Sequence, residues 1–397
     1  MDTLDALLRR DVAVGDDTKD KLLGAAFVVT DRNGVVYSGS AGRTGMNVNS
    51  PKFDIHTLTY GASLTKLLSA VCLMQLVEQD RLPLDSDVRK LVPEVQQMQI
   101  LRGFTSEEQP ILEDNERPIT LKQLILHTAG LRYDVGDPDL RRWSKAIGRP
   151  IGMTIRLSRD GFNVPLLFPP GDGWAYGPAL DWAGIALETV TNTTLGDYMK
   201  QHVLDPLGMH DTGFRVNRLP HTADRRAELT LRDADDNTLS HFEVVPEEPE
   251  IDSAGAGIHT TANDYARLLR AMLQAEPGVV SGKTAKEMFS PQLDPAQRKM
   301  LQETLYAPNQ KPAFIPEFPD GVELQYGYGG LLGMSDWPGQ QRRKGSLCWT
   351  GAANSRWWID PESGIAAVLM VAVFPFGDVV ATKLYADLIK AVYDELV

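Results

Sequence analysis

The sequence predicts an α/β protein of the α+β type, in which an antiparallel sheet is flanked by terminal helices and joined to a mostly helical insertion. Two observations predict this fold class. Strand-like runs stand near both ends of the chain, at 24–42 and 325–374, whereas helical patterns fill the middle. In addition, 397 residues are too many for one small core, which favours one large domain or two intimately packed ones.

Turn signals bound the expected strands. Two β-rich runs within 24–42 flank Asn33-Gly34, the dipeptide most typical of a tight hairpin. Nearer the other end, a turn at 360–364 separates the last two of four strand-like runs. These runs are 325–334, 345–351, 355–360 and 365–374. We expect them to pair with the early hairpin in a single sheet.

Helical periodicity marks the remaining elements, with Thr120 as a cap of one helix and Gly196 between two others. The helical ranges are 4–12, 63–80, 120–127, 181–209, 261–275 and 381–396. The first and last would cover the sheet. We therefore expect a discontinuous sheet domain, 1–60 with 250–397, and a mainly helical domain, 61–249, that carries helix 63–80 at the interface.

Composition excludes several classes of partner. The net charge of −13 repels phosphate backbones and anionic membrane surfaces, so neither nucleic acid nor a membrane is expected as a partner. Cys72 and Cys348 both lie in apolar strings, which predicts two buried free thiols and a reducing compartment. The first residues lack the apolar core of a signal peptide, and no apolar run reaches the ~18 residues of a membrane span. These observations predict a cytoplasmic protein.

The segment YGASLTKLLSA, residues 60–70, places a lysine in an apolar helix. Ser63 and Lys66 stand at i and i+3, so both side chains lie on one helical face, and Ser63 is near the positive end. Burial disfavours the charged ammonium, and a neutral amine can take the proton of a nearby hydroxyl. Because roughly one Ser-x-x-Lys is expected by chance in such a chain, the tetrapeptide alone does not decide for catalysis.

Other motifs give weaker signals. His202, His210 and Asp211 lack the spacing of metal ligands, so we expect no metal. The chain has no Gly-x-Ser-x-Gly nucleophile elbow. His127 can be considered as a catalytic base, but a helix-end histidine satisfied by the backbone is favoured.

Several longer strings, in order along nearly the whole chain, resemble the serine β-lactamase and penicillin-binding-protein superfamily. The resemblance is to its class C-like branch, which holds family VIII carboxylesterases and fungal acyltransferases of the lovastatin type. The strings that carry it include YGASLTKLLSAVCLMQLVEQDRLPLD, ITLKQLILHTAGL, GDGWAYGPALDWAGIALE, VLDPLGMHDTGF and WTGAANSRWWIDPESG. The resemblance implies a β-lactamase-like fold and an active-site serine, with no cofactor.

The resemblance also implies roles for particular residues. Ser63 would be the nucleophile, Lys66 the base beside it, and Tyr176 of Tyr176-Gly177-Pro178 would share the proton transfer. Trp349-Thr350-Gly351 matches the third motif of the family, on a strand facing the nucleophile. The backbone N–H groups of Ser63 and Ala352 would bind the oxyanion, and Trp349 and Gly351 would contact substrate.

Two departures from the β-lactamase pattern bear on the substrate. Trp349 stands where those enzymes usually have a lysine that binds the drug carboxylate, and Pro178 replaces an asparagine of the tyrosine motif. An indole can stack on an apolar acyl group but supplies no charge. Lys344, close to the third motif, could compensate in part.

Four functions follow, in descending order of preference. The first is a carboxylesterase-like hydrolase of small or medium acyl esters or thioesters, acting through an acyl-Ser63 intermediate. The second is an acyltransferase that moves an acyl group to an alcohol acceptor in secondary metabolism. A β-lactamase or D-aminopeptidase ranks third, and a non-catalytic binding module on the same scaffold ranks last. The oligomeric state is left open by the sequence.

Overall fold

A computed structural model describes residues 1–243, 248–274, 279–338 and 342–397. Within these residues seven strands form one sheet in the order β2-β1-β13-β12-β11-β10-β9, and all neighbouring pairs are antiparallel. The strands are β1 (Gly24–Asp31), β2 (Val35–Gly42), β9 (Leu324–Gly327), β10 (Gly330–Gly333), β11 (Leu347–Thr350), β12 (Arg356–Asp360) and β13 (Ile365–Met370). The predicted pairing of an early hairpin with late strands in one antiparallel sheet is confirmed.

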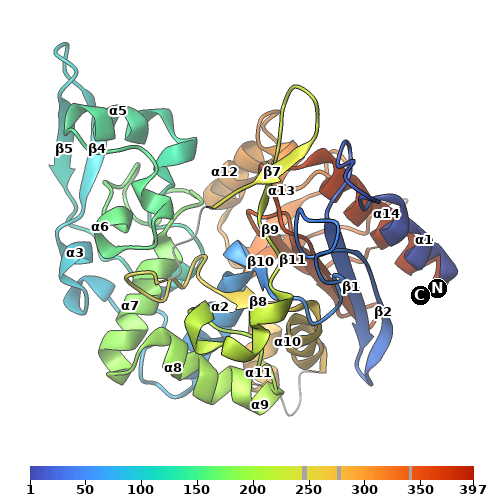
Figure 1. Ribbon diagram of the computed structural model, residues 1–397. Helices are drawn as coiled ribbons and strands as arrows, with labels where there is room; N and C mark the ends of the chain where they lie inside the picture. Colours follow the sequence, from blue (N-terminus) through green and yellow to red (C-terminus); the bar gives the residue numbers. More distant parts are fainter. Residues whose placement is uncertain (244–247, 275–278, 339–341) are drawn as a thin grey trace.

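Helices cover both faces of this sheet. Helices α1 (Asp2–Arg10) and α14 (Val379–Glu395) lie side by side at one end of the molecule, so the two chain termini are close together (Figure 1). Helix α10 (Ala262–Gln274) packs against β1, β12 and β13. Successive residues of β12 point to opposite faces: the Trp357 ring lies 6.4 Å from Tyr265 of α10, and the Trp358 ring 5.7 Å from Tyr385 of α14.

The second part of the molecule is built mainly from helices and lies beside the sheet, with α2 between the two (Figure 1). It contains helices α2 (Thr65–Glu78), α3 (Pro93–Gln96), α4 (Leu121–Ile125), α5 (Pro138–Ala146), α6 (Arg159–Phe162), α7 (Ala179–Thr191), α8 (Leu195–Met199) and α9 (Asp205–Leu207). Residues 65–76 of α2 are all buried, which explains why its sequence is mostly apolar. The fold class is confirmed; the residue bounds of the two domains stay a prediction.

Smaller elements complete the described chain. Sequence patterns missed the hairpin β4 (Gln99–Phe104) with β5 (Pro110–Asp114), whose second strand is mostly exposed and lacks apolar alternation. The other short strands are β3 (Thr59–Tyr60), β6 (Thr230–Arg232), β7 (Leu239–His241), β8 (His259–Thr260) and β14 (Val373–Phe374). The remaining helices are α11 (Gly282–Met288), α12 (Pro295–Leu305) and α13 (Lys311–Phe314). Among the described residues, none of the helices combines the length and apolarity needed to cross a bilayer.

Three expected boundaries were wrong. The run 325–334 is a hairpin, because Gly329 turns the chain at a φ of +108°. The run 365–374 breaks after Met370, and β14 pairs with β6 in another sheet. The break within 181–209 falls at Asn192, which ends α7 in a left-handed conformation, whereas Gly196 lies inside α8.

Candidate active site

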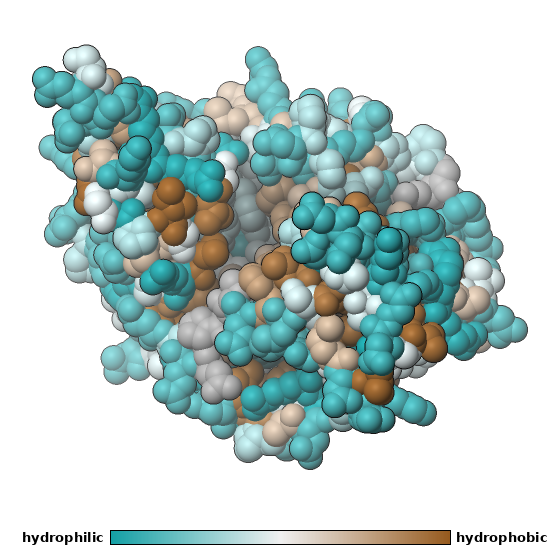
Figure 2. Space-filling view, turned by 45° about the horizontal axis from the view of Figure 1, so that its top comes forward, coloured by the Kyte–Doolittle hydropathy of each residue, from teal (hydrophilic) through white to brown (hydrophobic). Residues whose placement is uncertain are grey.

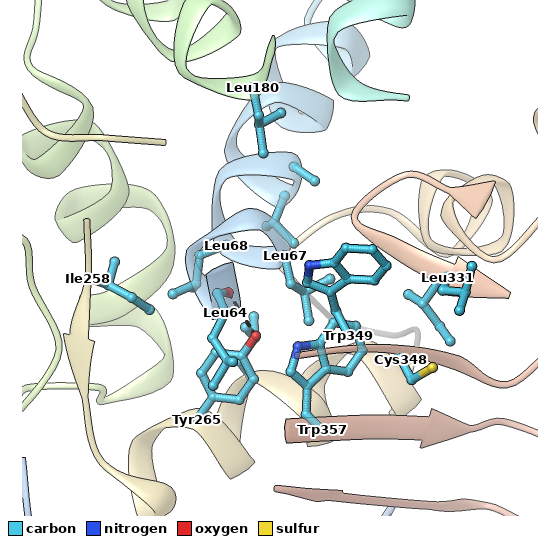
Figure 3. Packing of buried hydrophobic residues seen from close by; sticks show 14 of the residues in the cluster. Leu64, Leu67, Leu68, Leu180, Ile258, Tyr265, Leu331, Cys348, Trp349 and Trp357 are labelled. Carbon is cyan, nitrogen blue, oxygen red and sulfur yellow. Dashed lines mark hydrogen bonds between the residues drawn. The ribbon is translucent and has the colours of Figure 1, made fainter. Parts of the chain in front are cut away.

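The nucleophile candidate stands at a tight turn between a short strand and a helix. Strand β3 ends at Tyr60, and a 3₁₀ turn over Ala62–Leu64 leads directly into α2. Ala62 has a φ of +45°, a left-handed conformation that costs a residue with a Cβ about 1–2 kcal/mol. Packing holds this turn in place, because Leu64, Leu67 and Leu68 fit between the sheet and residues of α10 and its preceding loop (Figure 3).

Ser63 Oγ is hydrogen-bonded by two predicted site residues. Lys66 Nζ lies 3.1 Å from it, as the i,i+3 spacing on one helical face requires, and Tyr176 Oη lies 2.8 Å from it. Tyr176 comes from the segment just before α7, far away in sequence. The structure therefore brings together the three residues expected to carry the chemistry.

Lys66 is almost completely buried, with 1% of its surface exposed. Its amino group donates to the carbonyl of Gly255 at 2.7 Å, and the hydroxyl of Tyr133 lies 3.5 Å away. The nitrogen also lies over the Tyr176 ring, 4.7 Å from the ring centre. A buried lysine held in this way has its nitrogen directed at Ser63 and Tyr176 by fixed partners rather than by solvent.

Trp349 contacts Tyr176 rather than the open space of the site. Its indole N–H donates to Tyr176 Oη at 3.1 Å, and the two ring centres are 5.1 Å apart. The side chain is 5% exposed, and Trp349 is not among the residues that line the cavity at Ser63. Its role in contacting substrate stays a prediction; the hydrogen bond gives it a clear role in holding the phenol oxygen.

The end of β11 approaches the nucleophile turn closely. A Cβ on Gly351 would lie 2.6 Å from the carbonyl oxygen of Gly61, so only glycine allows this contact between backbones. Ala352, which follows, lines the same cavity as Ser63. The expected oxyanion pair, Ser63 N–H and Ala352 N–H, is thus placed on two segments that meet at the cavity, and its role stays a prediction.

A cavity of about 360 Å³ opens at Ser63, and most of its wall is apolar. In the space-filling view the molecule is hollowed between its two parts, and hydrophobic side chains gather along the edge (Figure 2). Aromatic residues from distant segments contribute to the wall: Tyr60, Tyr133, Phe162, Tyr176, Phe314, Phe374 and Phe376. Such a wall suits an uncharged acyl chain.

Charged groups are few in this wall. Among the described lining residues, Arg132 and Asp181 carry charge, and the Arg132 guanidinium lies 3.3 Å from the carboxylate of Asp137. Lys344 is exposed and does not line the cavity, so it does not replace the missing lysine of the third motif. Pro178 precedes α7 and provides only its carbonyl, which accepts from the backbone N–H of Asp181 at 3.1 Å.

Known proteins of similar sequence and fold identify the family. A family model described as Beta-lactamase matches residues 4–391. The chain belongs to the β-lactamase family. It is 32% identical to lovastatin esterase of Penicillium rubens, over 91% of this chain and 92% of that protein. It is 29% identical to monacolin J acid methylbutanoyltransferase of Aspergillus terreus, over 86% of this chain and 83% of that protein.

A solved structure shows the same likeness within the family. A mutant of simvastatin synthase from Aspergillus terreus superposes with a TM-score of 0.89 at 28% identity, covering 99% of this chain and 94% of that one. The expected family, its fold and an enzyme of the serine acyl hydrolase or acyltransferase type are confirmed.

The expectation for His127 was wrong in one respect. Its backbone ends the turn after α4, where Ala175 N–H donates to its carbonyl, but neither ring nitrogen has a hydrogen-bond partner among the described residues. The ring is enclosed by Trp174, Tyr176 and Tyr326. Burial, with a smaller contribution from the charge of Lys66, holds the pKa of His127 well below its usual range. A neutral, enclosed imidazole supports the Tyr176 ring.

We expect replacement of His127 by phenylalanine to reduce the acid sensitivity of the fold. The unfolded chain binds a proton at this histidine below pH 6.5, whereas the buried ring does not, so stability falls as pH drops below that value. The loss is up to about 1.4 kcal/mol per pH unit. Melting temperatures of both proteins between pH 7.5 and 5 should show a shallower decline for His127→Phe. Equal slopes for the two proteins would contradict the assignment.

We expect Gly351→Ala to lower kcat/KM about 100-fold. The added methyl would push β11 away from the Gly61 carbonyl, and a shift of about 1 Å at a reacting centre can cost that factor. Gly34→Ala is the control, because a Cβ there meets open space. Steady-state kinetics on a nitrophenyl ester would test this, and a Gly351→Ala enzyme within threefold of the wild type would refute the close contact.

Sequence reasoning missed three residues of the site: two contact Lys66, and the third lines the cavity. Tyr133 and Gly255 contact its nitrogen, and Asp181 is a buried carboxylate in the cavity wall. Asp181 carried a usable signal, since it stands in the apolar run ALDWAGIAL just as Lys66 stands in ASLTKLLSA. The other two have no local signal, because their position depends on loops folding back onto α2.

Proposed function

We propose that the protein is a serine acyl hydrolase of the carboxylesterase type that works through an acyl-Ser63 intermediate. The observation that carries this proposal is the position of Ser63 Oγ, 3.1 Å from Lys66 Nζ and 2.8 Å from Tyr176 Oη, at an apolar cavity. A hydroxyl between a buried amine and a phenol is suited to lose its proton as it attacks a carbonyl.

The proposed reaction has two halves. In the first, Ser63 Oγ attacks the ester carbonyl while its proton passes to the Lys66–Tyr176 pair; the oxyanion is bound by the backbone N–H groups of Ser63 and Ala352. Donors of that kind typically contribute about 2.7–4 kcal/mol each. Tyr176 then protonates the departing alcohol or thiol. In the second half, water attacks the acyl-serine along the same route.

The cavity supports small or medium acyl groups over large or charged ones. Each buried CH₂ group favours binding by about 0.8 kcal/mol, and a volume of about 360 Å³ leaves room for several of them. The absence of a lysine at 349 and of an amide at 178 removes two groups that would hold a β-lactam, so a β-lactamase or D-aminopeptidase ranks lower. The complete Ser63–Lys66–Tyr176 set speaks against a mere binding module.

Burst kinetics test this proposal. Mixing the enzyme with p-nitrophenyl butyrate should release about one nitrophenol per active site before the steady state, because nitrophenol is a good leaving group and we expect the acyl-enzyme to form faster than water hydrolyses it. Ser63→Ala should show neither burst nor turnover. A wild-type enzyme that is folded but releases no nitrophenol from acetyl, butyryl or octanoyl esters would refute it.

Acyl transfer to an alcohol is the second candidate function. One relative supports it: monacolin J acid methylbutanoyltransferase matches over 86% of this chain. Lovastatin esterase, which matches over 91% of this chain, supports hydrolysis instead. Transfer and hydrolysis share the acyl-serine and differ only in the acceptor. Measuring ester product with a bulky secondary alcohol present decides between them: rising nitrophenol release with formation of the new ester indicates transfer, and unchanged release indicates hydrolysis.

We also infer a cytoplasmic location. The support is that Cys72 and Cys348 are both buried and free, as proteins of reducing compartments commonly are. Cell fractionation followed by immunodetection would test it.

A further inference from the structure

A continuous chain of hydrogen bonds joins Lys66 to the buried carboxylate of Asp181. Lys66 Nζ donates to the Gly255 carbonyl at 2.7 Å. The N–H of the same peptide group, which belongs to Ala256, donates to Ser253 Oγ at 3.1 Å. Ser253 Oγ in turn donates to Asp181 Oδ1 at 2.5 Å. The Gly255–Ala256 peptide group and the Ser253 hydroxyl thus connect the amino group of Lys66 with the carboxylate of Asp181, in the first turn of α7.

The direction of every bond in this chain is fixed. Ser253 Oγ accepts the Ala256 N–H, so its own proton points to Asp181, which also accepts the Gly255 N–H at 2.9 Å. The carboxylate therefore receives two donors, and the amine donates at the opposite end. Dipoles aligned in one direction polarise one another, so the chain favours a positive charge on Lys66 and a negative charge on Asp181.

The carboxylate of Asp181 is buried and lies within the electrostatic influence of Lys66. It is 2% exposed, and Lys66 is the cation whose charge acts on it. Burial raises the pKa of Asp181, and the Ser253 hydrogen bond and the Lys66 charge oppose that rise. A buried carboxylate is costly unless it is compensated, and here the compensating charge belongs to the catalytic lysine.

Gly255 shows how closely the Asp181 carboxylate approaches the backbone of the 253–257 loop. A Cβ on Gly255 would lie 2.6 Å from Asp181 Oδ2 and 3.2 Å from its Cγ. Any larger residue would separate the acid from the loop and move the carbonyl that holds Lys66. The sequence SAGAG at 253–257 supplies a small residue at each position of this contact.

We propose that Asp181 is a positioning residue, which holds Lys66 through Ser253 and the Gly255–Ala256 peptide and strengthens it as the acceptor of the Ser63 proton. This inference rests on the proposed function, since it assigns a base role to Lys66. The other groups that face Lys66 are the hydroxyls of Ser63, Tyr133 and Tyr176 and the buried ring of His127. Asp181 is the carboxylate of this set, so its removal isolates the effect of negative charge.

The test uses Asp181→Asn, which keeps the shape and the acceptor for Gly255 but removes the charge. We expect kcat/KM on p-nitrophenyl butyrate to fall about 10- to 100-fold. In a plot of kcat/KM against pH, the rising limb of Asp181→Asn should lie about one unit lower than that of the wild type. The reason is that Lys66 loses a proton more easily when the nearby anion is absent. Ser253→Ala interrupts the hydrogen-bond chain but keeps the Asp181 charge, so it should move the rising limb in the same direction by a smaller amount. If Asp181→Asn does not fold, Ser253→Ala is the variant that tests the proposal.

Asp264→Asn is the matched control. Asp264 is another buried carboxylate, and it likewise accepts one backbone N–H, from Asp211 at 2.8 Å, and one hydroxyl, from Thr212 at 3.0 Å. If Asp181→Asn lowers activity only by destabilising the fold, Asp264→Asn should lower activity by a similar factor. In that case neither variant should shift the dependence of kcat/KM on pH. That outcome would overturn the proposal, as would an Asp181→Asn profile that superposes on the wild type.

A readout independent of turnover separates this inference from the proposed function. The ¹³Cε signal of Lys66, assigned by its loss in Lys66→Arg, should change over a lower pH range in Asp181→Asn than in the wild type. The shift should be seen even if no ester is hydrolysed, in which case only the proposed function fails. Identical NMR titrations in the two proteins would overturn the link between Asp181 and Lys66.

Discussion

Replacement of Ser63 by alanine is expected to lower kcat by about 10⁴- to 10⁶-fold, the largest effect of any single change in the chain. The reason is chemical: the alanine side chain cannot form the acyl intermediate, and the water that could take its place lacks the fixed contacts with Lys66 and Tyr176. Steady-state kinetics with p-nitrophenyl butyrate measure the loss, and unchanged melting shows that the fold is intact.

The same helix offers a matched control for this substitution. Ser69 is fully buried in α2, and its hydroxyl has no hydrogen-bond partner among the described residues. Ser69→Ala should therefore leave activity unchanged and stability equal or slightly higher, since an unsatisfied buried polar group is removed. A Ser63→Ala enzyme that retains a tenth of the wild-type activity would exclude Ser63 as the nucleophile.

Lys66→Met is expected to reduce kcat by about 10²- to 10⁴-fold while leaving the protein folded. Methionine fills a similar volume but cannot take a proton from Ser63 Oγ. On stability two effects oppose each other: the Gly255 carbonyl loses its donor, which costs about 1–3 kcal/mol, and burial of a charge is avoided. We therefore expect a melting temperature within a few degrees of the wild type.

Lys344→Met is the control for Lys66→Met, because Lys344 is exposed and outside the cavity wall. Its activity should equal that of the wild type. Loss of activity in Lys344→Met would instead restore a substrate-binding role for this lysine, and full activity in Lys66→Met would remove Lys66 from the mechanism.

Much of the site could be predicted because its parts are local. The pair Ser63 and Lys66 needs only one helical turn, and an amine in an apolar run is visible in the sequence itself. The hairpin 24–42 is equally local, since its turn includes Asn33-Gly34 and Asp31 Oδ1 accepts the N–H groups of both residues. When two residues belong to the same helix or hairpin, their spacing in the sequence is enough to predict that their side chains lie close together.

Contacts between distant segments could not be predicted in this way. Tyr176 was found only through family resemblance, because residue spacing does not say that a loop 113 residues away meets Ser63. The hydrogen bond from the Trp349 indole N–H to Tyr176 Oη joins two residues 173 positions apart, which no spacing in the sequence indicates. Gly329 was predicted to lie within a strand, but it turns the chain at a φ of +108°, where an added Cβ would lie 3.1 Å from Leu67 and 3.2 Å from Ala70 of α2.

The proposed mechanism requires that Ser63 carries an acyl group during turnover. Intact-mass spectrometry after mixing with p-nitrophenyl butyrate and quenching in acid tests it most directly, followed by peptide mapping. We expect one butyryl increment, located on Ser63, in the wild type and none in Ser63→Ala. An adduct on another residue, or the same adduct in both proteins, would contradict it.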